Sequence, residues 1–279
     1  DLEKISLPPK SEQLSIANYL DEQTQKIDRL IANKKAQVEK LKELRQIEIN
    51  NAVTKGLNPN AEMKDSGIEW IGEVPTNWEV KRIKRIAEIL RGASPRPIDD
   101  EKYFDDNGEY SWVRISDVTA SDTYLNETYE KLSELGSSLS VKINPGDLFV
   151  SIAGSVGKPI ISKIKACIHD GFVWLKKPTV NTKFLYYILN AEGIYGGLRK
   201  LGTQLNLNIQ IIGSVMIPIP PITEQIVIAN YLQQRTTAID QLIKNIEVQI
   251  EKLQELRKIK IYEAVTGKIK VNAYAETTA

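Results

Sequence analysis

The feature that most constrains this chain is a long segment that occurs twice, at an offset of 212 residues. Residues 8–54 and 220–266 align without a gap and are identical at 27 of 47 positions. Chance does not produce such agreement, and the offset is far wider than the ~20–50 residues of solenoid repeats. The segment is therefore a duplicated unit, and a separate structure must lie between its two copies.

Each copy has the pattern of a long amphipathic helix. Apolar residues recur at spacings of three and four, with no glycine or proline after the leading Pro-Pro. Gly56 and Gly267 follow the copies, as expected at helix ends. A helix of about 40 residues is about 60 Å long. The predicted seam contains Ile27, Leu30, Gln37, Leu41, Leu44, Ile239, Leu242, Gln249, Leu253 and Leu256.

A helix this long with so narrow a seam needs a partner, and the other copy is the nearest candidate. We expect the two copies to pack antiparallel as a coiled coil. Gln37 and Gln249 occupy equivalent positions, where a polar seam residue can fix the register; alternatively, both lie at the seam edge. Two separate surface helices on a globular core would fit so long and narrow a seam less well.

The segment between the copies has the pattern of a mixed domain. Short β-prone runs separated by turn residues predict strands at 110–115, 147–152, 158–162, 172–176 and 215–219. A helix is predicted over 182–193. The predicted fold class is α+β: one mixed α/β domain together with two long helices that form an antiparallel coiled coil.

The predicted domain boundaries follow from the repeat and from composition. The first helix spans 8–57, a linker rich in Asn, Pro, Gly and acids spans 58–75, the mixed domain spans 76–219, the second helix spans 220–267, and a tail spans 268–279. Residues 1–7 stand before the first copy where the last predicted strand stands before the second. We therefore expect residues 1–7 to be the last strand of a preceding domain, and the chain to be the C-terminal portion of a longer protein.

Signatures of catalysis are weak. Residues 153–159 (AGSVGKP) resemble a phosphate loop, but only two residues separate the glycines, and Pro159 stands where a magnesium-binding hydroxyl should be. Cys167 and His169 are two residues apart without further metal ligands nearby, which is more typical of a structural pair. We predict no catalytic residue, no metal and no cofactor.

Composition indicates a globular protein, with 42% hydrophobic and 26% charged residues. The sequence shows neither an apolar run of ~18 residues nor a signal-peptide pattern, and a single cysteine excludes an intrachain disulfide. We therefore expect a cytoplasmic location and no membrane partner. The net charge of +1 does not by itself indicate a nucleic-acid partner.

Local groups of residues are nevertheless suited to contact DNA. Arginine reads guanine through two hydrogen bonds, Asn and Gln read adenine, and Lys, Ser and Thr suit phosphates. Each such residue alone is more often an ordinary surface residue. The candidates are Arg91, Ser94, Arg96, Trp112, Arg114, Lys158, Lys200, Thr203, Gln204, Asn206 and Asn208.

Particular strings in the chain are similar to a known family. In the helices they are Pro220–Gln225 with Ile228–Leu232, the matching string from Pro8, and Glu-Leu-Arg at 43–45 and 255–257. In the central domain they are residues 77–80 (NWEV), 91–95 (RGASP), 144–147 (NPGD) and 202–206 (GTQLN). On these strings, the whole chain resembles the specificity (S) subunit of type I restriction-modification enzymes. The helix strings are the more specific part of the resemblance.

The resemblance implies a function and partners. In that family, two target-recognition domains lie at opposite ends of an antiparallel helix pair, and each reads half of an interrupted site in double-stranded DNA. The helices dock methyltransferase (M) subunits, through which restriction (R) subunits join, and the S subunit itself performs no chemistry. This chain would hold one recognition domain and both helices, and would read a half-site unless a homodimer restores the second half.

Two other functions remain open on the residues alone. A coiled-coil scaffold whose central domain binds protein would share every helix feature. An enzyme is the weaker alternative, because the sequence shows neither a cofactor loop nor an acidic metal cluster. Salt-dependent affinity for duplex DNA would favour the specificity subunit over the scaffold.

Overall fold

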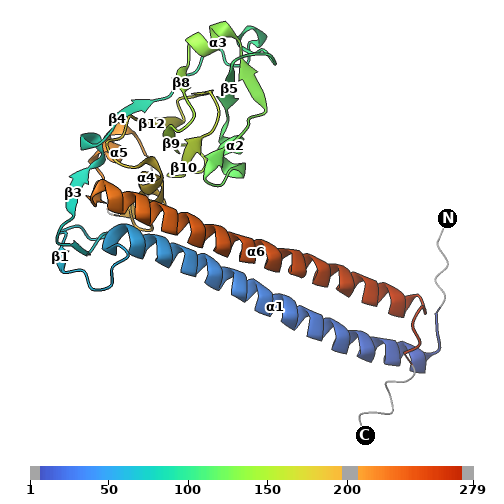
Figure 1. The fold of residues 1–279 in the computed structure, drawn as a ribbon. Helices are drawn as coiled ribbons and strands as arrows, with labels where there is room; N and C mark the ends of the chain where they lie inside the picture. Colours follow the sequence, from blue (N-terminus) through green and yellow to red (C-terminus); the bar gives the residue numbers. More distant parts are fainter. Residues whose placement is uncertain (1–6, 197–206, 272–279) are drawn as a thin grey trace. The chain divides into compact units, whose positions relative to one another are not determined.

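Two long helices and a sheet-rich lobe make up the computed structural model of the chain, which describes residues 7–196 and 207–271 (Figure 1). The chain divides into two compact units. The first contains residues 1–45 and 236–279, and the second contains residues 46–235. The strand predicted over residues 1–7 lies outside the described residues except for Leu7.

The two copies of the repeat form the two longest helices, α1 (Lys10–Lys55) and α6 (Ile222–Val265). Their uninterrupted length follows from the absence of glycine and proline within them. Gly56 and Gly267 follow the helices with φ angles of +74° and +70°, which only glycine adopts without strain. The predicted stop signals are thus confirmed.

Within the first unit, α1 and α6 run antiparallel, side by side (Figure 1). Arg45 Nε donates to Asp240 Oδ1 at 2.9 Å, and Arg257 Nε donates to Asp28 Oδ1 at 2.9 Å. Moving along α1 from Asp28 to Arg45, the partner on α6 moves back from Arg257 to Asp240, as antiparallel helices require. The 212-residue offset converts Arg45 into Arg257 and Asp28 into Asp240, so the two ion pairs are equivalent and the helix pair has local two-fold symmetry.

The least exposed residues of the helix pair follow a heptad spacing. Within 24–45 and 236–257, every residue outside one row on each helix is exposed. The spacing along each row alternates between three and four, as in a coiled-coil seam. The rows are Thr24, Ile27, Ile31, Lys34, Val38, Leu41 and Arg45 on α1, and Thr236, Ile239, Ile243, Ile246, Ile250, Leu253 and Arg257 on α6.

This row corrects the predicted seam. Ile27, Leu41, Ile239 and Leu253 belong to it, whereas the other six predicted residues are exposed and lie beside it. Polar residues such as Lys34 and Arg45 take seam positions instead, because their apolar stems can be covered while their charged ends bond to the opposite helix. The six misplaced residues are Leu30, Gln37, Leu44, Leu242, Gln249 and Leu256.

The second unit contains the lobe, in which short strands alternate with short helices. The strands are β1 (Met63–Asp65), β2 (Glu73–Pro75), β3 (Glu79–Arg82), β4 (Glu88–Arg91), β5 (Tyr110–Val113), β6 (Tyr124–Leu125), β7 (Glu130–Leu132), β8 (Val141–Ile143), β9 (Leu148–Ser151), β10 (Pro159–Ser162), β11 (Ala166–Ile168), β12 (Phe172–Lys176) and β13 (Met216–Ile219). The helices are η1 (Ile83–Arg85), η2 (Glu101–Tyr103), α2 (Ile115–Ala120), α3 (Glu134–Ser138), α4 (Thr182–Leu189) and α5 (Ile209–Ser214). The five strands and the helix predicted from sequence are confirmed, with slightly different ends.

Two sheets form the body of the lobe. One has the strand order β4-β12-β9-β10-β6 and the other β7-β5-β11-β8; both are mixed, since β6 joins β10 and β5 joins β11 in parallel. Their facing side chains share one core, which includes Val113 of β5, Phe149 of β9 and Phe172 of β12. Phe149 and Phe172 meet edge to face, with ring centroids 5.4 Å apart. The confirmed fold class is therefore mixed α and β.

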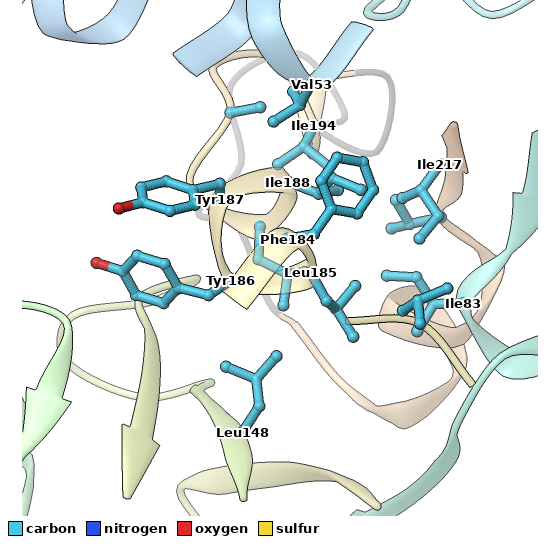
Figure 2. Close-up of a cluster of buried hydrophobic side chains, with 14 of the residues drawn as sticks. Val53, Ile83, Leu148, Phe184, Leu185, Tyr186, Tyr187, Ile188, Ile194 and Ile217 are labelled. Carbon is cyan, nitrogen blue, oxygen red and sulfur yellow. The ribbon is translucent and has the colours of Figure 1, made fainter. Parts of the chain in front are cut away.

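The larger core of this unit surrounds α4. All six residues from Phe184 to Leu189 are buried, as expected for a helix that is apolar on every side. Figure 2 shows this cluster, with Leu148 on one side of the helix and Val53 of α1 on the other. Asn181 caps the helix by accepting a hydrogen bond from the Phe184 amide at 3.0 Å.

Polar contacts within the second unit hold the adjoining ends of the long helices. Glu48 of α1 accepts from the Tyr231 hydroxyl at 2.8 Å and from Arg235 Nη2 at 2.7 Å. The bonds from Arg235 and Tyr231 keep the pKa of Glu48 below its usual range. Strand β13, directly before α6, pairs antiparallel with β3 and so joins the end of the lobe to its start. Among the described helices, none is long and apolar enough to cross a membrane.

Candidate nucleic-acid interface

The loop over residues 91–96 lies along the turn that joins β11 to β12. The Gly92 amide donates to the carbonyl of Phe172 at 3.0 Å, and the Ala93 amide donates to the carbonyl of Ile168 at 3.0 Å. A Cβ atom at Gly92 would lie 2.0 Å from the carbonyl oxygen of His169. Only glycine permits so close an approach of two backbones, which explains the Arg-Gly dipeptide that begins this loop.

Asp170, at the tip of that turn, joins the candidate residues of the loop. Arg91 Nε donates to the Asp170 carbonyl oxygen at 2.8 Å, and Arg96 Nη2 lies 3.3 Å from the carboxylate. The Ser94 hydroxyl lies 3.5 Å from the other carboxylate oxygen. The side chain of Arg96 is nevertheless 80% exposed. The structure thus brings Arg91, Ser94 and Arg96 together around one acidic residue.

An aromatic layer supports this turn from beneath. The imidazole of His169 lies 4.5 Å from the ring of Phe172 and 5.8 Å from that of Trp112, measured between centroids. Its Nδ1 accepts a hydrogen bond from the Gly171 amide at 2.9 Å, so the neutral ring carries its proton on Nε2. Burial lowers the pKa of His169, although the neighbouring Asp170 carboxylate opposes the shift.

Trp112 is a correction to the predicted contacts. Its side chain is only 2% exposed and packs with Leu132 and Cys167. It cannot meet a base in this position, and its contribution is to support His169. The Cys167 thiol is buried in the same cluster, and burial raises its pKa to about 12, which keeps it protonated and unreactive.

Lys158 is a second correction. Its ammonium group donates to the carbonyls of Thr119 at 3.1 Å and Ser121 at 2.5 Å, at the C-terminal end of α2. Burial lowers its pKa, because the charged form is partly removed from water. These bonds place the ammonium group where it closes the end of a helix, and a phosphate would have to displace them.

Other candidates are engaged within the protein or lie outside the described residues. Arg114, at the start of α2, forms an ion pair with Glu130 that raises its pKa, and half of its side chain stays exposed. Asn208 caps α5 by accepting from the Ile211 amide at 2.9 Å, so its side-chain oxygen is already used. The predictions for Lys200, Thr203, Gln204 and Asn206 fall outside the described residues.

Chemically, the 91–96 loop is suited to an anionic or acceptor-rich ligand. It presents two guanidinium groups and a hydroxyl, and Arg96 is anchored at only one nitrogen in the contacts described. The sequence indicated these residues through the Arg-Gly-Ala-Ser-Pro-Arg string. It did not indicate Asp170, since the pairing of this turn with a loop some 80 residues earlier follows only from the antiparallel pairing of β12 with β4.

The exposed residues beside the helix seam form a second candidate surface. Leu30 and Leu44 are 49% and 40% exposed, and their repeat counterparts Leu242 and Leu256 are 51% and 40% exposed. In each helix, an exposed glutamine lies midway between the two leucines. The antiparallel register places Leu30 near the level of Leu256, and the local two-fold places both rows on one face. We call these four leucines, together with Gln37 and Gln249, the leucine stripe.

Comparisons with known proteins agree on one family. The family model described as "Type I restriction modification DNA specificity domain" matches residues 75–252. A putative type I restriction enzyme MjaX specificity subunit from Methanocaldococcus jannaschii is 29% identical, over 96% of this chain and 60% of the relative. The MjaVIII specificity subunit of the same organism is 28% identical, over 96% of this chain and 62% of the relative. The chain thus spans about 60% of the length of these relatives.

Solved structures support the same fold. A chain from a study of complex assembly and conformational transition of the type I R-M system has a TM-score of 0.74 at 20% identity, covering 95% of this chain and 62% of that chain. The HsdS subunit from Thermoanaerobacter tengcongensis has a TM-score of 0.56 at 21% identity, covering 95% and 60% respectively. At such identities, the likeness concerns the fold alone.

Proposed function

Because the chain belongs to the family of type I restriction modification DNA specificity domains, we propose that it reads one half of an interrupted DNA target and docks methyltransferase subunits through its helices. It would act as a non-catalytic component, in keeping with relatives that are named specificity subunits. Restriction subunits would join through the methyltransferase.

The observation that carries DNA reading is the arrangement of the 91–96 loop. Two arginines and a serine from one loop are gathered on one exposed edge of the lobe, and Arg96 is fixed at one end while most of its side chain is exposed. A guanidinium group held in this way can offer two parallel hydrogen bonds to guanine or to a phosphate. We infer recognition of only one half of the target because the described residues contain a single sheet-rich lobe, and each lobe would read one sequence.

The leucine stripe supports the docking of a partner on the helices. On each helix two exposed leucines, fourteen residues apart with a glutamine midway, leave apolar side chains exposed to water on one face of the pair. The local two-fold makes the two halves of the row equivalent, so a partner with two identical helices would meet identical surfaces. Two methyltransferase subunits fit that description. A homodimer of this chain is the second candidate, since the same symmetry suits self-association.

The first experiment measures binding of the purified chain to a random-sequence duplex as salt is raised. We expect weak binding that falls about 10- to 100-fold between 50 and 200 mM salt, because phosphate contacts release counterions. Arg96→Ala should weaken binding to a selected duplex by ~1–3 kcal/mol. Arg29→Ala, which removes an exposed arginine of α1 instead, is the control and should change binding little. Affinity that is absent or insensitive to salt would favour the protein-binding scaffold.

The second experiment tests docking by co-purification with the methyltransferase subunit. Leu30→Asp and Leu242→Asp should abolish the complex, because a carboxylate in the leucine stripe would be buried against the partner. Their melting temperatures should stay within a few degrees of the wild type, since both positions are half exposed in the chain alone. Ala36→Asp, at an exposed position outside the stripe, is the matched control. Stripe variants that still co-purify, or a control that does not, would refute this surface.

A further inference from the structure

We propose that Asp170 is a positioning residue for sequence reading, which fixes the direction in which Arg96 presents its guanidinium group to a base. This inference rests on the proposed function and names a residue that contacts the proposed reading residues but is not itself suited to bind a phosphate. A carboxylate repels phosphates, so a direct contact between Asp170 and the DNA backbone would be unfavourable.

Asp170 holds the loop by two chemically different means. Its backbone carbonyl accepts from Arg91 Nε, while its carboxylate faces Arg96 Nη2 at 3.3 Å and the Ser94 hydroxyl at 3.5 Å. Substitution of the side chain therefore releases Arg96 and Ser94, whereas the bond from Arg91 to the backbone remains possible. The role of the carboxylate can thus be separated from the role of the turn.

The position of Asp170 is itself held firmly. The amides of Gly92 and Ala93 bond to carbonyls on either side of the turn, and the Ile152 amide donates to the Gly171 carbonyl at 2.8 Å. His169, packed against Phe172 and Trp112, supports the turn from the core side. A carboxylate on so rigid a support restricts a side chain that is otherwise 80% exposed.

Restricting Arg96 matters because base reading depends on direction. Guanine is recognised by two parallel hydrogen bonds that require a defined guanidinium plane, whereas a phosphate accepts an arginine from many directions. Asp170 also reduces the local positive charge, which lessens attraction to every duplex alike. Both effects favour discrimination between sequences over indiscriminate affinity.

The test compares two duplexes: one enriched from a random library by the wild-type chain, and a scrambled duplex of the same composition. The measured quantity is the ratio of their dissociation constants. Asp170→Ala should lower this ratio about 10-fold, which is the scale of one well-oriented base contact. Asp170→Asn, which keeps an acceptor oxygen and is the milder change for folding, should lower it less. Asp106→Ala removes an equal charge from an exposed turn of the same lobe and should leave the ratio unchanged.

A double variant tests whether Asp170 acts through Arg96. If it does, Asp170→Ala combined with Arg96→Ala should discriminate no worse than Arg96→Ala alone. Three results would each overturn the positioning role. The first is a ratio of dissociation constants that is unchanged in both Asp170→Ala and Asp170→Asn. The others are an equal loss of this ratio in Asp106→Ala, and fully additive losses in the double variant. A wild-type chain that enriches no duplex would instead refute the proposed function itself, so the two failures are distinguishable.

Discussion

Burial controls the ionisation of the only histidine in the chain. His169 is packed between two aromatic rings, and burial lowers its pKa below the ordinary value of about 6.5. Above pH ~6.5 both the folded and the unfolded chain carry a neutral His169. As the pH falls, the unfolded chain binds a proton first, so the contribution of His169 to stability is lost as the pH drops through its folded pKa.

We therefore predict that the lobe loses stability between pH 7.5 and pH 5.5 through His169. An asparagine at this position could still accept the hydrogen bond from the Gly171 amide, and its side chain does not titrate. The free energy of unfolding of the wild type should fall between these pH values by more than that of His169→Asn, as measured by denaturant titration. The single imidazole can also be titrated directly by NMR. A pKa of 6.5 or higher, or equal pH dependence in both proteins, would contradict this account.

At the residue scale, the sequence predicts which cations are exposed better than it predicts which residues contact one another. The string at 91–96 indicated a loop with two arginines, and the structure gathers them. The predictions for Trp112 and Lys158 differ from the structure, because nothing local in the sequence distinguishes an exposed tryptophan or lysine from one that is engaged inside the fold. Their true partners, His169 and the carbonyls that end α2, come from other parts of the chain.

At the scale of elements, the long helices were predictable but their buried face was not. Hydrophobicity alone favours Leu30 and Leu44 for the seam, yet a strict heptad row passes through Lys34 and Arg45. A seam can accept these polar residues when their ends reach a partner across the pair, and Arg45 reaches Asp240 at 2.9 Å. The order of the strands in the sheets is equally unpredictable from the sequence, because β5 pairs with β11, which lies far from it in the chain.

The corrected seam gives a prediction with a matched control. Ile27→Ala and Ile239→Ala remove side chains that are 6% and 4% exposed, so each should destabilise the helix pair by ~2–4 kcal/mol. Leu30→Ala and Leu242→Ala remove side chains that are about half exposed and should cost less than ~1 kcal/mol. Thermal or denaturant unfolding measures the difference. Equal losses of stability for the two sets of variants would support the seam predicted from sequence over the row seen in the structure.

At the scale of the whole molecule, the duplication accounts for the helices but not for the lobe. The equivalent ion pairs of Arg45 and Arg257 show that the helix pair keeps the symmetry of the repeat. The described residues contain one sheet-rich lobe and no symmetric counterpart of it, which is why we propose a half-site for one chain. The repeat made this asymmetry predictable from the sequence, whereas the residues that select a base sequence depend on contacts within the lobe.

The most direct test of DNA reading is a methylation map of the genome of cells that express the chain with the methyltransferase subunit proposed as its partner. The account predicts methylation at one short sequence motif, and a different motif when residues 76–219 are replaced by the corresponding lobe of a relative. Methylation that does not require the chain, or a motif that stays the same after the exchange, would contradict it.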